Sequence, residues 1–101
     1  MQLPKKIKVG RKWYAVEMHH SGLDKSLMGR VHYPERKIHL GLRSKRHGYK
    51  YAKAEIYDTF WHELVHAILE DMGQDSLNRN ERFVTGFANR LTKAIMSAKF
   101  E

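Results

Sequence analysis

The segment Thr59–Ile68, TFWHELVHAI, contains the motif H-E-x-x-H within an otherwise apolar stretch. Apolar residues recur around it at spacings of three and four, which predicts a helix over about 53–72. Residues four apart share one helix face, so His62 and His66 can direct two imidazoles at one metal ion. Glu63 is close enough to hold a metal-bound water and accept its proton. This segment therefore predicts a catalytic metal site.

The choice of metal follows from the side chains that the chain contains. It has no cysteine, which excludes thiolate ligands and leaves imidazole and carboxylate donors for Zn²⁺. The alternative is a pair of core histidines that bond to backbone carbonyls, and composition alone produces the motif with a chance of roughly two per cent. Burying His62, Glu63 and His66 without partners would be costly, and metal binding accounts for all three residues together.

A third ligand is expected, because catalytic zinc takes three protein ligands and keeps one position for water. Glu81 is the best candidate, since it lies fifteen residues after His66, where the chain has turned back along the first helix. The competing interpretation is a capping box over 78–81, in which Glu81 reaches back to the N-cap amide. The other nearby carboxylates are Glu70, Asp71 and Asp75.

Further residues are candidates for supporting roles. Asp58 lies one turn before His62 and is placed to accept a hydrogen bond from a ligand imidazole, or it is only a first-turn acid favoured by the helix dipole. Thr85, one turn after Glu81, is a weaker candidate for the same contact. An additional donor to a reaction oxyanion would help catalysis. The candidates are His47, Tyr49, Tyr51 and Arg79, and the sequence does not choose among them.

The rest of the chain predicts an α+β fold. Apolar and polar residues alternate over 5–18 and again over 29–42, with a turn at Pro34–Lys37, so strands are expected over about 5–42. A polar loop, Gln74–Arg79, leads to a second amphipathic helix over about 79–98. We expect a single domain, 1–101, with two helices on one face of an antiparallel sheet of three or four strands.

Charge is unevenly divided along the chain. Residues 1–53 carry 14 Lys and Arg against three acids, and residues 54–101 carry five against eight. The basic half predicts an anionic partner, usually nucleic acid, although a solvated basic sheet surface is an equal alternative. No apolar run approaches the ~18 residues of a membrane span, and no apolar segment follows the N-terminal charges as in a signal peptide. We expect a cytoplasmic monomer without a membrane partner.

The motif His62-Glu-Leu-Val-His66, followed by Asn80-Glu81, Val84 and Ala88, resembles the gluzincin zinc metallopeptidases. It is most similar to small phage and bacterial members related to ImmA/IrrE-type peptidases, over residues 29–98. The resemblance implies a minimal zincin-like fold that hydrolyses a protein or peptide substrate in a bacterial or phage-infected cell. It also implies Zn²⁺ bound by His62, His66 and Glu81, with Glu63 as general base.

The resemblance has two further implications and one departure. It implies that the strand Lys37–Leu42 is the edge strand beside the cleft and pairs with an extended substrate. The alternative is that Lys37–Leu42 is an inner strand of the sheet. No third histidine follows His66, which argues against the metzincin branch. The family often has Asn or Asp four residues after the ligand, where this chain has Thr85, so the departure concerns a supporting contact and not the ligand.

Two alternatives remain beside a general peptidase. The basic half suggests a peptidase that acts on DNA-bound proteins, as SprT-like enzymes do. The other alternative is a basic module that binds nucleic acid or protein without catalysis and has a structural or degenerate zinc site.

Overall fold

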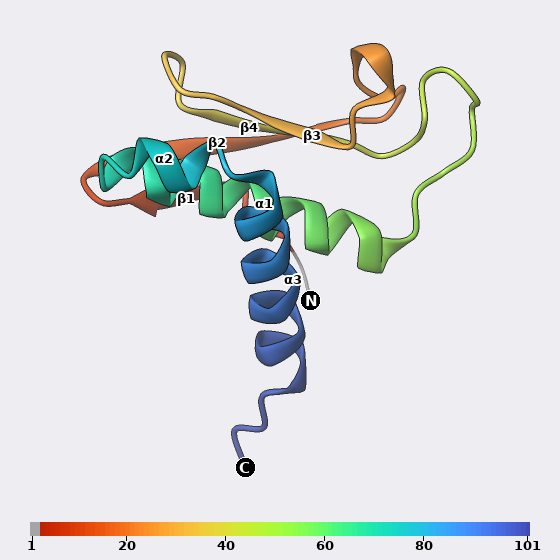
Figure 1. Cartoon of the computed structure of the whole chain (residues 1–101). Helices are drawn as coiled ribbons and strands as arrows, with labels where there is room; N and C mark the ends of the chain where they lie inside the picture. The colour runs from red at the N-terminus through yellow and green to blue at the C-terminus, as the bar shows by residue number, and fades with distance from the viewer. Residues whose placement is uncertain (1–2) are drawn as a thin grey trace.

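The computed structural model describes residues 3–101 and has an α+β architecture, as the sequence predicts (Figure 1). The two long helices agree with the predicted ranges to within two residues. Between residues 3 and 101, no helix is long and apolar enough to cross a membrane. The elements in chain order are β1 Lys6–Val9, β2 Lys12–His19, the 3-10 helix η1 Asp24–Ser26, β3 Gly29–His32, β4 Lys37–Gly41, α1 Lys53–Asp71, α2 Asp75–Asn78 and α3 Glu81–Ser97.

The sheet is mixed, so the expectation of a purely antiparallel sheet is wrong. Its strand order is β1-β2-β4-β3. The pairs β1–β2 and β3–β4 form antiparallel hairpins within the predicted strand regions 5–18 and 29–42. In contrast, β2 and β4 run parallel, with Ala15 opposite Lys37 and His19 opposite Gly41. The segment 20–28 carries the chain past the position of β4 to the far edge of the sheet. The turn after β3 then brings β4 back between β2 and β3.

This topology corrects the expected position of the substrate-binding strand. The predicted edge strand, Lys37–Leu42, contains β4, which lies inside the sheet between β2 and β3. Ile38 and Leu40 have no exposed surface, in keeping with a central strand. The edge strands are β1 and β3, and β3 is the one that lines the cleft with His62, Glu63 and His66.

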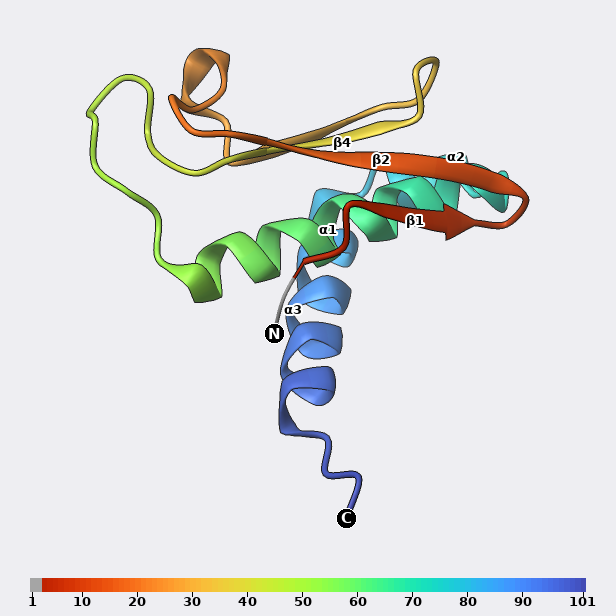
Figure 2. The ribbon, with the colours of Figure 1, turned by 180° about the vertical axis from the view of Figure 1, so that it is seen from behind.

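Two hydrophobic clusters hold the helices in place. The first joins the sheet to α1, and the second joins α1 to α3, which extends away from the sheet (Figures 1 and 2). Ile68, in the apolar stretch of α1, is 38% exposed and belongs to neither cluster. The first cluster contains Val9, Tyr14, Ile38, Leu40, Phe60, Leu64 and Ala67, and the second contains Val65, Leu69, Val84 and Ala88.

The connection between α1 and α3 decides where Glu81 lies. The predicted loop 74–79 contains the short helix α2, and Gly73, at φ +71°, ends α1 in a left-handed conformation. The N-cap of α3 is Asn80, whose side chain accepts a hydrogen bond from the Phe83 amide at 3.0 Å. Glu81 is therefore the first residue of α3 and not the third residue of a capping box.

Candidate metal centre

Three predicted ligands converge at the junction of α1 and α3. His62 and His66 lie one turn apart on α1, with ring centroids 5.0 Å apart. Glu81 directs one carboxylate oxygen at each ring, with Oε2 3.2 Å from His62 Nε2 and Oε1 2.9 Å from His66 Nε2. One ligand atom from each residue lies within 4.8 Å of the others. The chain thus brings these residues together although Glu81 lies on a different helix.

The donor set matches what zinc requires. Zn–N bonds of about 2.0–2.1 Å place tetrahedral ligand atoms roughly 3.3 Å apart, close to the observed separations. Asn78 Oδ1 lies 2.6 Å from His66 Nδ1, and an amide oxygen only accepts, so Nδ1 donates. In a neutral ring, His66 Nε2 then presents a lone pair to Glu81. Either a proton or a cation must lie between them, and two imidazoles with a carboxylate are the ligands of known catalytic zinc sites.

Asn78 orients His66, a role that the sequence suggested for Asp58. Asn78 accepts from His66 and donates through Nδ2 to the Tyr33 hydroxyl at 3.1 Å. The predicted hydrogen bond from a ligand imidazole to Asp58 is not formed, because the buried Oδ1 of Asp58 has no hydrogen-bond partner within residues 3–101. It lines a separate hollow between α1 and α3. Thr85 is exposed and makes none of the side-chain hydrogen bonds found in the described chain.

Replacing Asn78 by alanine should weaken zinc binding about 10- to 100-fold, since hydrogen-bond partners of ligand histidines contribute effects of this size. His66 would lose the acceptor that fixes its tautomer and ring orientation. Competition with a fluorescent zinc chelator measures the affinity. Ser76→Ala, on the same short helix and exposed, is the control and should bind zinc as the unaltered chain does. Equal affinities in the two variants would show that Asn78 does not orient a ligand.

Glu63 is buried beside the two histidines. Glu63 is only 8% exposed, and this burial raises the pKa of its carboxyl to about 7. The positive charge of His66 opposes this shift, and the negative charge of Glu81 adds to it. A cation bound by the histidines would lower the pKa again. Burial therefore favours the protonated form of Glu63, whereas a bound cation would favour the carboxylate, which can accept a proton.

Gly29 allows α1 to lie close to the edge strand. A Cβ at Gly29 would lie 2.6 Å from Thr59 Cγ2, which is too close, and 3.1 Å from Glu63 Cγ, which is a tight contact. The absence of a side chain lets Glu63 lie against β3. The candidate general base and the free sheet edge are thus adjacent.

An open cleft of about 360 Å³ lies between β3, α1 and the start of α3. The Glu81 side chain is 65% exposed, so the ligand cluster is accessible from solvent. The residues lining the cleft are Leu27, Gly29, Arg30, Val31, Tyr33, His62, Glu63, His66 and Glu81.

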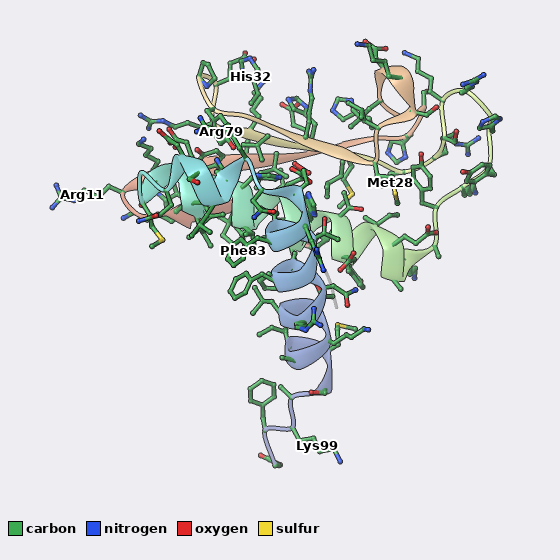
Figure 3. The ribbon with its side chains drawn as sticks, in the orientation of Figure 1. Arg11, Met28, His32, Arg79, Phe83 and Lys99 are labelled. Atoms are coloured by element: carbon green, nitrogen blue, oxygen red, sulfur yellow. The ribbon has the colours of Figure 1, made fainter. Side chains whose placement is uncertain are left out.

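None of the four expected oxyanion donors lines this cleft. Tyr51 donates to the Ser26 carbonyl at 3.4 Å, and Tyr49 packs between Tyr51 and His47 in the basic segment after β4. Arg79 follows α2 and is exposed (Figure 3). Tyr33 lines the cleft instead, and burial raises its pKa, so its hydroxyl is protonated at neutral pH.

A sequence signal for Tyr33 exists in the alternation of the second hairpin. Tyr33 falls on the same strand face as Gly29 and Val31, and this face turns toward α1. Asn78 has no comparable signal, because it lies in a short polar segment without periodicity.

Comparison of the chain with protein-family models, with curated proteins and with solved structures found no match.

Proposed function

We propose that the protein is a zinc-dependent peptidase that hydrolyses peptide bonds, with His62, His66 and Glu81 as metal ligands and Glu63 as general base. One observation carries the proposal: three suitable ligand atoms converge beside a buried glutamate in an open cleft. When bound there, zinc supplies Lewis acidity toward a carbonyl and lowers the pKa of a water molecule.

The exposure of the site favours catalysis over a structural metal. Structural zinc is enclosed by four protein ligands, whereas a catalytic site keeps one position open. Three candidate ligands converge here, and Glu81 faces solvent on the open side of the cleft. The non-enzymatic alternative requires a closed or incomplete site, which this arrangement does not favour.

Glu63 and Tyr33 have separate roles in the proposed reaction. Glu63 accepts the proton of the attacking water and delivers it to the leaving amine. The Tyr33 hydroxyl accepts from Asn78, so its own hydrogen is free to donate to the oxyanion that forms on the substrate carbonyl. His66, Asn78 and Tyr33 thereby form one hydrogen-bonded chain from the ligand to the cleft.

The substrate is proposed to be an extended protein or peptide segment bound along β3. This strand has a free edge and lies beside Glu63, so its backbone groups can add a substrate strand to the sheet. β3 replaces Lys37–Leu42 in this role. The absence of cysteine is compatible with a reducing compartment, and we place the activity in the cytoplasm.

Removing metal tests the proposal directly. Treatment with a chelator should abolish cleavage of a labelled unfolded casein, because the Lewis acid that polarises the scissile carbonyl is then missing. An equimolar amount of zinc should restore the cleavage. Fluorescence release measures the activity, and elemental analysis verifies the metal content. Undiminished cleavage by protein shown to be free of metal would contradict the proposal.

A second candidate function is binding of nucleic acid, and the open face of the sheet favours it. Lys6 and Lys8 place their ammonium groups 4.7 and 5.8 Å from the centre of the Trp13 ring, which is half exposed. Basic groups beside an exposed aromatic ring suit phosphates and bases. This surface belongs to the predicted basic half, residues 1–53, and would bring the peptidase to DNA-bound proteins.

Replacing Lys6 and Lys8 together by glutamine should weaken DNA binding and reduce the slope of log affinity against log salt by about 1.8, because each phosphate contact contributes about 0.9. Fluorescence anisotropy with a labelled duplex at several salt concentrations measures both effects. Lys93→Gln, an exposed lysine on α3, removes one charge outside this surface; it is the control and should leave the slope unchanged. An identical slope in both variants would exclude this surface, and DNA that stimulates cleavage would favour the SprT-like alternative.

A further inference from the structure

A second group of metal-ligating side chains lies on the sheet face opposite α1. Strand pairing places Glu17 beside His39 on the parallel strands β2 and β4, and His19 follows two residues after Glu17 on the same face. Ile38 and Leu40, the neighbours of His39, point to the other face and pack against α1. We call Glu17, His19 and His39 the open-face cluster. Figure 3 shows side chains rising from this face, away from the helices.

The three ligand atoms of the open-face cluster converge as closely as those of the first site. His19 Nε2 lies 2.9 Å from His39 Nδ1, and Glu17 Oε2 lies 3.6 Å from His39 Nδ1 and 4.0 Å from His19 Nε2. One atom from each residue lies within 4.8 Å of the others. Ligands of tetrahedral zinc are roughly 3.3 Å apart, so small side-chain movements would accommodate the ion.

The strands hold these groups in position. His39 is 7% exposed and lies opposite Glu17 in the paired strands, so its ring has little freedom to move. The Lys37 ammonium lies 3.1 Å from Glu17 Oε1 and leaves Oε2 directed toward the histidines. Such a partner orients a ligand carboxylate.

We propose that the open-face cluster is a second binding site for a divalent cation of the zinc class, with His19, His39 and Glu17 as ligands. The ion would join β2 to β4, the parallel pair of the sheet, where the chain leaves β2 for the segment 20–28. Lys37 and Arg30 place positive charge beside this site, which would oppose the binding of a cation. Its bound ion stabilises the sheet and takes no part in hydrolysis.

Zinc content after equilibrium dialysis distinguishes the two sites. At a zinc concentration that saturates both sites, the unaltered chain should hold two equivalents of zinc. The variant His66→Ala should hold one equivalent. The double variant His66→Ala/His19→Ala should hold none. His66→Ala/His20→Ala is the matched control, because His20 is exposed, adjacent in sequence and outside the cluster. This control should retain one equivalent.

Two results would overturn the proposal. One is a His66→Ala chain that holds no zinc. The other is a His66→Ala/His19→Ala chain that still holds one equivalent of zinc. His19 is half-buried at the end of β2, and if its alanine variant does not fold, Glu17→Gln in the His66→Ala chain decides the question by a loss of affinity of at least tenfold. Failure of the first site alone gives a different pattern, in which the bound zinc depends on His19 and not on His66.

Discussion

The variant Glu63→Gln should lose peptide hydrolysis by a factor on the order of 10³ while it retains zinc, because general acid–base catalysis contributes about 10²- to 10⁴-fold. Glutamine has nearly the shape of glutamate but cannot accept the proton of the attacking water. The buried position suits an uncharged amide, so the variant should fold as the unaltered chain does. Initial rates on a labelled unfolded substrate, with zinc content measured on the same samples, test this expectation.

The control for this experiment is Glu35→Gln, an exposed glutamate in the turn between β3 and β4. It should keep both hydrolysis and zinc. Retention of hydrolysis by Glu63→Gln would remove Glu63 as general base. Loss of zinc together with activity would give Glu63 a role in the metal site itself.

Replacing Glu81 by alanine should lower zinc affinity by more than about 100-fold and abolish hydrolysis, because residues that merely orient ligands already contribute about 10- to 100-fold. Glu81 is the first residue of α3 and is largely exposed, so the change removes a ligand without opening the core. Two histidines one turn apart on α1 would then hold the ion from one side only. Chelator competition and thermal unfolding separate the loss of metal from loss of fold.

Asp75→Ala is the control for Glu81, since Asp75 is an exposed carboxylate on the neighbouring helix α2 and an alternative ligand by sequence. It should leave zinc affinity unchanged. If Glu81→Ala keeps its affinity and Asp75→Ala loses it, the third ligand is Asp75 and the site has been assigned wrongly.

Local periodicity accounts for what could be predicted from this chain. The spacing of apolar residues predicts α1 and places His62 and His66 on one face, because both facts depend only on helix geometry. The two hairpins follow from alternation within 5–18 and 29–42. Glu81 also follows from local information, since the breaker Gly73 and the polar segment after it turn the chain back toward His66.

The remainder depends on contacts between distant segments. Alternation shows which face of a strand is buried but does not specify its neighbours, so the parallel pairing of β2 with β4 and the edge position of β3 could not be predicted. Asn78 contacts His66 and Tyr33 only because α2 lies beside the turn that follows β3. The open-face cluster depends likewise on the register of two strands that are not adjacent in the chain.

Glu81 at the start of α3 has a consequence for the folding of the whole chain. α3 is attached through the small cluster that Val84 and Ala88 form with α1, and through the carboxylate beside the histidines. A bound ion is therefore linked thermodynamically to the docking of α3: each increment in zinc affinity is also an increment in the stability of the docked helix. If zinc is the bound ion, its supply would add to the stability of the docked α3 that Val84 and Ala88 already provide.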